Sequence, residues 1–392
     1  MSESYSKLGA SASKQGLHKA LKSSGLETDQ GLFSSVFPDS AGDPGYRSFL
    51  HCDGAGTKSA VAYLLYKATG DPSHFAGLAQ DALVMNLDDV YCIGVPEGLL
   101  LSNLLARNAS LIPDEVIEVI LTAYRKLAEQ LASLGISLTL SGGETADCGD
   151  VVRTLVVDAV LAGRIREPGL IRASTIRSGD AIVGLSSTGR CAYEDEEGSG
   201  IGSNGLTLAR HALLSKDAER FPEVFDPGLD PSLRYRGPFA VTDTPSELPM
   251  SIGKALLSRT RTYAPVLKKA YLSLGEHIHG VIHCTGGGQT KVLRFGTGNF
   301  YVKDRLFDVP PLFDLIRRHG KVSWKEMYQV FNMGHRMEVY LDPKGVPELI
   351  GLASDHGVEA RQIGEVRPSE IDGQNHLRLS SPEGDLDYQL TR

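Results

Sequence analysis

The sequence of 392 residues has few cysteines, one tryptophan and no long apolar run. Its five cysteines are scattered and never form a CxxC pair, so neither a disulfide framework nor a structural zinc site is expected. No apolar stretch approaches the roughly 20 residues that a membrane-spanning helix needs. Basic residues are not in excess either, because the net charge is −8 and both signs are mixed along the chain. These deficits argue against a membrane protein and against a protein whose main task is to bind nucleic acid.

What the sequence does contain is an ordinary globular composition, with 41% apolar and 22% charged residues. A chain of this length is expected to form two domains, each with a core of its own. The first residues, MSESYSKLGASASKQ, have no apolar centre, so no signal peptide is predicted. Together with the unpaired cysteines, this favours a protein of the reducing cytoplasm.

The spacing of apolar residues predicts a mixture of strands and helices, which is typical of an α+β or α/β fold. Strands are expected at residues 46–52, 136–140, 153–165, 180–185 and 280–284, and helices at 74–94, 113–134, from the GSNG motif to 214, and at 263–274. Ser73 is the expected N-cap of the helix at 74–94.

Two regions are expected to lie outside the two cores. Residues 1–48 are polar and rich in glycine and serine, and we expect an arm or lid with one short helix from about Leu17 to Leu21. The second region, between Arg166 and Gly179, is polar and contains a Pro-Gly pair. We therefore predict an N-terminal domain of residues 1–168 and a C-terminal domain of residues 169–392.

Four glycine-containing loops are the first signal of function. They read DGAGTK at 53–58, SGGETAD at 141–147, GSNG at 202–205 and TGGGQTK at 285–291. Glycine lets the backbone approach a ligand closely and direct its N–H groups at phosphate oxygens. None of the loops is a P-loop or a dinucleotide-binding fingerprint. For any one loop alone, a tight turn remains an equal alternative.

Carboxylates in an apolar helix are the second signal. The segment GLAQDALVMNLDDVYCIG holds Asp81, Asp88 and Asp89, and the first two are seven residues apart and therefore share one face. Buried carboxylates are costly unless they are paired or bound to a cation. With Asp53 and Glu144 from the glycine loops, they suit Mg²⁺ bound together with phosphate oxygens. The alternative is that this helix face is solvated.

Basic residues and histidines near these motifs are weaker candidates. Lys58 and Arg261 are expected to provide positive charge for a phosphorylated substrate, although a single basic residue is usually a surface charge. His283 and His335 lie beside motifs of interest, and each is as often structural as catalytic.

Eight motifs together carry a resemblance to a known family. They are SYSKLG, DGAGTK, LVMNLDDV, LSGGETAD, GSNGLTLAR, TRTYAPVLKKA, HCTGGGQTK and FNMGHRM, and they span nearly the whole chain. In these motifs and their order the chain resembles the aminoimidazole ribonucleotide synthetases, also called phosphoribosylformylglycinamidine cyclo-ligases. The resemblance implies a two-domain fold, with an N-terminal mixed sheet that joins a β-barrel in a homodimer and a C-terminal α/β domain.

The resemblance also implies a reaction and a set of site residues. Formylglycinamidine ribonucleotide and ATP would become aminoimidazole ribonucleotide, ADP and phosphate, with Mg²⁺ as cofactor. The implied catalytic residues are Lys58, Asp89 and His335, and the implied metal ligands are Asp53, Asp81, Asp88, Asp89 and Glu144. ATP would be bound by Asp53, Gly54, Gly56, Thr57, Lys58, Gly142, Gly143, Glu144 and Thr145. The substrate phosphate would be bound by Gly202, Ser203, Asn204, Gly205, Arg261, Gly286, Gly287 and Gly288.

The chain departs from the family pattern at the third loop. Many members read HSNG there, with a histidine thought to take part in the chemistry, whereas this chain has Gly202. The acidic segment 193–200 just before it resembles an insertion. One hypothesis is that His335 replaces the missing histidine; the alternative is that the family histidine is dispensable.

Two other functions stay open on the sequence. The first is a different ATP-using member of the superfamily, such as a selenophosphate synthetase, a thiamine-monophosphate kinase or a hydrogenase maturation factor. No cysteine precedes Cys52, which argues against a selenophosphate synthetase. The second is a non-catalytic nucleotide-binding paralogue, for which Gly202 would be the sign.

Overall fold

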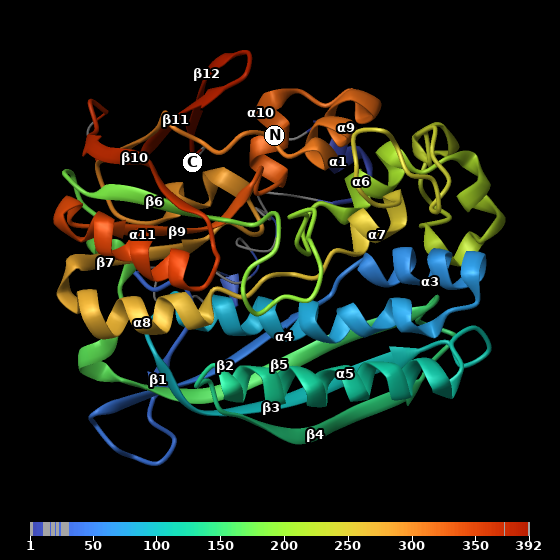
Figure 1. The fold of residues 1–392 in the computed structure, drawn as a ribbon, viewed down its shortest axis with the longest axis horizontal. Coiled ribbons are helices and arrows are strands. Elements are labelled where there is room, and N and C mark those ends of the chain that lie inside the picture. Colours follow the sequence, from blue (N-terminus) through green and yellow to red (C-terminus); the bar gives the residue numbers. More distant parts are fainter. Residues whose placement is uncertain are drawn as a thin grey trace.

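The computed structural model describes residues 3–10, 16, 20, 23–24, 31–371 and 373–390. Leu17 and Leu21, the ends of the short helix expected in the N-terminal arm, lie outside these residues, so that prediction is not tested. The chain forms two β-sheets, one from strands before residue 167 and one from strands after residue 180. Figure 1 shows the first sheet at one edge of the molecule and the second sheet on the other side of helix α4.

The first sheet has five strands in the order β1-β2-β5-β3-β4. Strands β3 and β4 pair in parallel and the other neighbours pair antiparallel. The strands are β1 (Phe37–Pro38), β2 (Tyr46–Gly54), β3 (Pro96–Arg107), β4 (Leu138–Asp147) and β5 (Leu155–Arg166). The helices that precede residue 167 are α1 (Glu3–Lys7), α3 (Lys58–Thr69), α4 (Ala76–Tyr91) and α5 (Asp114–Ser133).

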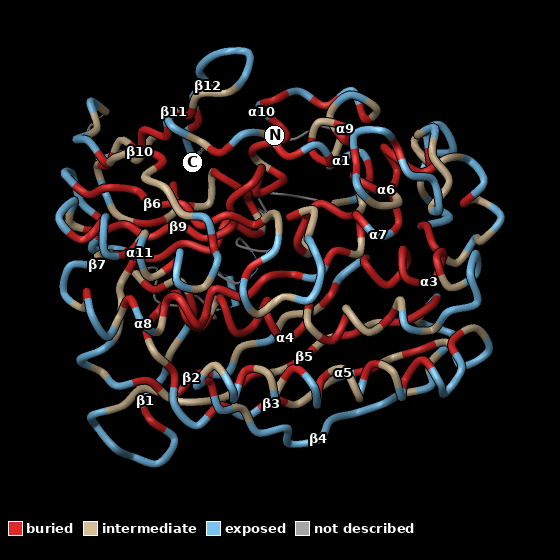
Figure 2. Tube along the Cα trace, viewed as in Figure 1, coloured by how far each residue is buried: buried red, intermediate tan, exposed pale blue. Residues whose placement is uncertain are grey.

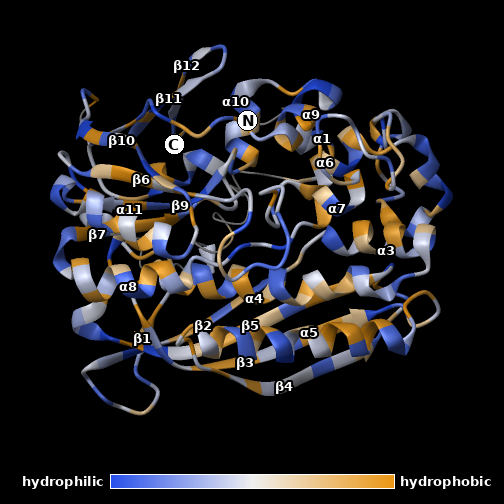
Figure 3. Cartoon of the chain, viewed as in Figure 1, coloured by the Kyte–Doolittle hydropathy of each residue, from blue (hydrophilic) through white to orange (hydrophobic). Residues whose placement is uncertain are grey.

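The alternation of buried and half-buried residues along β5 shows which face of this sheet is covered. Leu155, Val157, Ala159 and Leu161 are buried, while the residues between them are only half-buried. The buried set faces α4, which contacts both β2 and β5. The opposite face is open and apolar, with Leu50, Leu100 and Leu104 exposed at 63%, 46% and 40%. Figure 3 shows hydrophobic stretches along these strands.

Helix α4 lies between the two halves of the molecule, and most of its residues are buried (Figure 2). It contacts α5 and the first sheet on one side and α8 of the second half on the other. Asp81 and Asp88 are both fully buried. The alternative that this helix face is solvated is therefore wrong.

The second sheet has seven strands in the order β12-β11-β8-β10-β6-β9-β7. Strand β9, next to the edge strand β7, is buried at every residue, and it pairs with β6 on one side and β7 on the other. The strands are β6 (Ala181–Ser186), β7 (Ile278–His283), β8 (Asn299–Lys303), β9 (His335–Leu341), β10 (Ala360–Pro368), β11 (His376–Ser381) and β12 (Gly384–Gln389). The helices are α6 (Leu206–Leu213), α7 (Ile252–Leu257), α8 (Ala264–Leu274), α9 (Pro311–Gly320), α10 (Trp324–Val330) and α11 (Val346–Asp355).

Most expected elements are confirmed within two or three residues, and three details are corrected. The SGGETAD motif was expected as a loop after a short strand, but β4 continues through it because each residue from 143 to 147 pairs with β3. The DGAGTK loop begins later than expected, since β2 runs to Gly54. Ser73 is not an N-cap: it lies inside a 3₁₀ turn, Pro72–Phe75, that is capped by the Asp71 carboxylate.

The described part of residues 1–48 is less peripheral than expected. Leu8 and Leu32 are buried, and β1 pairs with β2 at the edge of the first sheet. The segment between the sheets contains two short 3₁₀ turns, as its polar composition suggested, and the domain boundary at 168/169 stays a prediction. Within the described residues, no helix combines the length and hydropathy needed to span a membrane.

Candidate active site

Three of the four glycine loops lie against one another. A side chain at Gly56 in DGAGTK would place its Cβ 3.9 Å from the carbonyl oxygen of Ser203 in GSNG. The Asn204 side chain then accepts a hydrogen bond of 3.3 Å from the backbone N–H of Gly286 in TGGGQTK. DGAGTK leads into α3 and GSNG leads into α6, so two helix N-termini begin at this meeting point. Loops of this kind direct backbone N–H groups at anions.

The fourth motif, SGGETAD, lies apart from the other three. In the first sheet Gly54 pairs with Asp158, Asp158 with Leu104, and Leu104 with Glu144. Three strand spacings separate Gly54 from Glu144, which is about 14 Å. Directly paired residues share a face, so Glu144 lies on the open face with Leu104. Gly142, Gly143 and Thr145 belong to the same exposed edge strand.

Asp81 forms a buried ion pair with Lys58. The Lys58 Nζ lies 2.7 Å from Asp81 Oδ1 and 2.6 Å from the carbonyl oxygen of Ser258. Burial lowers the pKa of Lys58, while the Asp81 charge opposes that shift. The same Oδ1 accepts hydrogen bonds from the backbone N–H and the hydroxyl of Thr260. Lys58 and Asp81 therefore hold the segment around residue 260 against α3 and α4.

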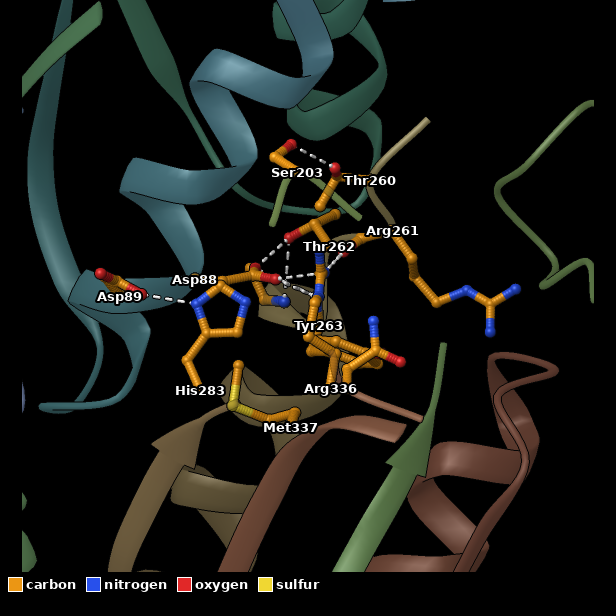
Figure 4. Close-up of polar contacts among 12 residues, drawn as sticks. Asp88, Asp89, Ser203, Thr260, Arg261, Thr262, Tyr263, His283, Arg336 and Met337 are labelled. Carbon is orange, nitrogen blue, oxygen red and sulfur yellow. Dashed lines mark hydrogen bonds and ion pairs between the residues drawn. The ribbon is translucent and has the colours of Figure 1, made fainter. Parts of the chain in front are cut away.

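Asp88, two turns further along α4, holds the next part of that segment (Figure 4). Its Oδ1 accepts from the Thr262 hydroxyl at 2.6 Å and from the Tyr263 N–H at 3.1 Å. Its Oδ2 accepts from Arg336 Nη2 at 3.2 Å. Burial raises the pKa of Asp88, and Arg336 opposes that shift. We call residues 260–263 the tethered segment, because carboxylates of α4 bind both of its ends.

Asp89, the next residue of α4, does not bind the tethered segment but lies between two histidines. Its Oδ1 lies 2.5 Å from His283 Nδ1, and its Oδ2 lies 3.4 Å from His51 Nε2. Burial alone would raise the pKa of Asp89, but the hydrogen bonds from both histidines hold it well below its usual range. For His51, burial lowers the pKa, but the bonds to Asp89 and Asn86 raise it to about 9. Asp89 therefore keeps its negative charge at neutral pH.

The five predicted metal ligands do not form one compact cluster. Within the described parts of the chain, the one group of three possible ligand residues with atoms within 4.8 Å is Cys284, His335 and Glu338. Asp81 and Asp88 are bound by protein cations, and Glu144 lies on the other face of the sheet. Asp53 lies beside His51 on the covered face and remains near Asp89. Metal binding by any of the five stays a prediction.

Arg261, the predicted phosphate ligand, is bound entirely to protein acceptors. Its guanidinium makes five hydrogen bonds, two to Glu194 and three to carbonyl oxygens of Ser186, Thr188 and Gly189. Glu194 belongs to the acidic segment 193–200, whose Tyr193 hydroxyl also donates to the carbonyl oxygen of Thr262. A direct contact between Arg261 and substrate therefore requires release from Glu194, and the role stays a prediction.

His335 is enclosed in a polar cluster below the TGGG loop. Its Nε2 lies 2.9 Å from Glu338 Oε1, which also accepts a hydrogen bond of 2.5 Å from Lys303 Nζ. Burial lowers the pKa of His335. Its ring stacks on Phe307 and is 1% exposed. The hypothesis that His335 replaces the missing histidine stays untested, and this position favours a structural role.

Sequence reasoning missed four residues of this site: His51, Glu194, Arg336 and Glu338. His51 lies two residues before the DGAGTK motif, and Arg336 lies inside the FNMGHRM motif, so their positions were available as signals. Glu194 lies in the acidic segment 193–200 and Glu338 directly follows FNMGHRM, but nothing in the sequence indicated that they bind Arg261 and Lys303.

Two family models match most of the chain. Residues 33–165 match the family model "AIR synthase related protein, N-terminal domain", and residues 177–373 match the corresponding C-terminal domain model. The chain belongs to the AIR synthase related protein family. Most of its described secondary structure falls within these two matches.

Two relatives of this AIR synthase related protein carry the same description. The phosphoribosylformylglycinamidine cyclo-ligase of Methanococcus vannielii is 29% identical over 340 residues, which cover 84% of this chain and 80% of that protein. The cyclo-ligase of Thermoanaerobacter sp. is 30% identical over 325 residues, covering 81% and 82%.

Solved structures show the same fold at low sequence identity. The HypE–HypF complex structure aligns with a TM-score of 0.56 and 13% identity, covering 96% of this chain and 99% of that one. T. maritima PurL complexed with FGAR aligns with a TM-score of 0.53 and 15% identity. The alignment covers 92% of this chain but only 47% of the PurL chain.

Replacing Gly205 by alanine tests the packing of the GSNG loop. Gly205 has φ +75°, and a Cβ there would lie 2.2 Å from Cε1 of the buried Phe331. Gly70 is a matched control, because it has φ +74° and no atom within 4 Å of such a Cβ. In urea unfolding we expect Gly70→Ala to cost about 1–2 kcal/mol and Gly205→Ala about 1–3 kcal/mol more. Equal losses would show that the loop does not depend on contact with Phe331.

Breaking the Lys58–Asp81 pair tests whether it fixes the tethered segment. Lys58→Met should destabilise the protein by about 3–5 kcal/mol, because it leaves the buried Asp81 charge uncompensated. The double variant Lys58→Met/Asp81→Asn should recover a large part, since the amide oxygen still accepts from Thr260. The exposed Arg125–Glu129 pair is the control, and Arg125→Met should change stability by less than about 1 kcal/mol. A double variant as unstable as Lys58→Met would contradict this reading.

Proposed function

We propose that the chain is a phosphoribosylformylglycinamidine cyclo-ligase, an ATP-dependent ligase of purine biosynthesis. The single observation that carries this proposal is the meeting of the DGAGTK, GSNG and TGGGQTK loops beside ionised Asp89. Relatives named for this activity match over about four-fifths of both chains. The substrate is formylglycinamidine ribonucleotide, and the products are aminoimidazole ribonucleotide, ADP and phosphate.

The chemistry explains why the site combines anion-binding loops with fixed charges. The formyl oxygen is a poor leaving group, so ATP first phosphorylates it. A nitrogen of the same substrate then attacks the activated carbon, the imidazole ring closes and phosphate leaves. Phosphoryl transfer depends chiefly on positioning and on charge stabilisation. The loops provide backbone N–H donors, and the tethered segment keeps them in register with α4.

Mg²⁺ is the cofactor that this proposal requires. Asp89 suits a hard cation because it stays ionised. Asp53 lies on the face of the first sheet that is covered by α4, the helix that carries Asp89. When bound, the ion would neutralise charge on the phosphates of ATP. His283 would orient Asp89 through their 2.5 Å contact, as an outer partner does for a metal ligand. Asp81 and Asp88 act instead through the tethered segment.

A homodimer is the second part of the proposal. The open face of the first sheet exposes Leu50, Leu100 and Leu104, and contiguous apolar surface of this kind is usually covered by a partner. A second copy that covers this face would also bring ligands to Glu144, which the register directs away from Asp53 of its own chain. Each ATP site would then use residues of both copies. The cytoplasm remains the expected compartment.

A coupled assay tests the activity directly. Purified protein with MgATP should release ADP only when formylglycinamidine ribonucleotide is present, and aminoimidazole ribonucleotide should appear as product. Removing Mg²⁺ with EDTA should abolish turnover, and adding it back should restore it. Asp89→Asn should lower kcat by about 10²–10³-fold, whereas Asp355→Asn on the exposed end of α11 should not change it. No turnover by a folded protein would favour a non-catalytic paralogue, and ADP release without the ribonucleotide would indicate another substrate.

The dimer has its own test. Light scattering should give the wild type twice the mass of the 42.2 kDa chain, and Leu100→Glu should convert it to monomer. Leu272→Glu is the matched control, because Leu272 is 76% exposed on α8, far from the sheet in sequence and on another element. A wild-type monomer, or an unchanged mass in Leu100→Glu, would exclude this face as the interface.

A further inference from the structure

Arg336 is a buried cation whose hydrogen-bonding capacity is only partly used. It is the largest fully buried side chain among the described residues, and it is 2% exposed. A guanidinium has five N–H donors. Nη2 donates to Asp88 Oδ2 and to the carbonyl oxygen of Arg261. Nε and Nη1, which carry the other three N–H groups, have no partner within the described chain.

Unpartnered donors inside a protein are unfavourable, so their retention needs a reason. Arg261 lies beside Arg336 and has all five donors satisfied by Glu194 and backbone carbonyls. The local structure is therefore able to saturate a buried guanidinium where no ligand is needed. At Arg336, by contrast, the local structure leaves three N–H donors available for a ligand.

The free donors of Arg336 face the third glycine loop. A Cβ at Gly202 would lie 3.4 Å from Arg336 Cδ and 3.6 Å from Nη1. Because residue 202 is glycine, no side chain of that residue lies against the guanidinium. The backbone of Arg336 is also joined to the start of the other glycine loop, since its carbonyl accepts a 2.7 Å hydrogen bond from the backbone N–H of Cys284, directly before TGGG. Arg336 thus lies where the two loops meet.

We propose that Arg336 binds a phosphate group of the reactants at the junction of the GSNG and TGGG loops. The inference rests on the proposed function for the identity of the reactants. The phosphate is either the 5′-phosphate of the ribonucleotide or the phosphoryl group transferred from ATP. Arg336 supplies fixed positive charge and a planar set of donors that match phosphate oxygens. It exchanges no proton, because a guanidinium stays protonated at neutral pH.

Asp88 positions this guanidinium. The ion pair uses one end of the group, through Nη2, and leaves Nε and Nη1 to the loops. Because Asp88 also binds Thr262 and Tyr263, the orientation of Arg336 is tied to the tethered segment. Fixing the group before the ligand arrives reduces the entropy lost on binding.

Inorganic phosphate is the probe for the first test. Thermal unfolding of the intact protein should shift to higher temperature as phosphate is added, because a ligand that binds only the folded state stabilises it. In Arg336→Met, phosphate should bind about 10- to 100-fold more weakly. Arg210→Met is the matched control: Arg210 is also buried and has an unpartnered Nε, but it bonds Val224 and Tyr235 away from the loops. That variant should lose stability and keep the phosphate shift.

Arg336→Lys keeps the proposal testable if Arg336→Met does not fold. Lysine retains a cation for Asp88 but lacks the planar fork, so the protein should fold and bind phosphate more weakly. A phosphate shift in Arg336→Lys or Arg336→Met equal to that of the wild type would overturn the proposal, as would a wild type that phosphate does not stabilise. These outcomes need no turnover, so they are independent of the activity assay.

Kinetics of an active enzyme then identify which phosphate is bound. If Arg336 binds the 5′-phosphate, Arg336→Lys should raise KM for the ribonucleotide and leave kcat nearly unchanged. If it binds the transferred phosphoryl group, kcat should fall and KM should change little. Unchanged values of both constants would contradict the proposal even where phosphate binding differs.

Discussion

The two carboxylates of α4 that bind the tethered segment are the constraint on which the site depends. Asp81 and Asp88 lie on one face of a helix that is buried between the two sheets. Each takes backbone N–H and hydroxyl groups of residues 260–263 as donors, and each is neutralised by a buried cation. These cations also connect the carboxylates to the glycine loops, because Lys58 begins α3 after the DGAGTK loop and Arg336 lies beside the GSNG loop. One helix thereby sets the relative positions of loops that come from both halves of the chain.

Buried ion pairs of this kind add little net stability, because the desolvation of both charges offsets most of their attraction. Their value here is geometric. A carboxylate that binds two donors and a cation allows few alternative placements of the segment it holds. The apolar cores of the two halves stabilise the fold, while the polar contacts across α4 decide how the loops face each other. The Lys303–Glu338–His335 cluster has the same character below the TGGG loop.

The sequence was sufficient for the fold and for the candidate motifs, but not for how the motifs are arranged. Periodicity located α5 and β5 because their apolar stripes are regular and face a single core. It failed at SGGETAD, where pairing with β3 overrides the weak strand propensity of glycine. Carboxylates on α4 were correctly expected to be buried, yet their partners are protein cations whose distance in sequence hides them. Arg261 and Arg336 show the same limit, since only three-dimensional contacts distinguish a saturated guanidinium from an unsaturated one.

The tethered segment is also fastened from its other side by the acidic segment. Glu194 binds the Arg261 guanidinium, and the Tyr193 hydroxyl binds the carbonyl oxygen of Thr262, while Asp88 binds the neighbouring amide. An amide held in this way exchanges its hydrogen with solvent only when both attachments open together. The slowest-exchanging amides of the second half are then not confined to its central strands. The amides of Thr260 and Tyr263, which lie outside regular secondary structure, would exchange as slowly as the core and would report the opening of the interface between the two halves.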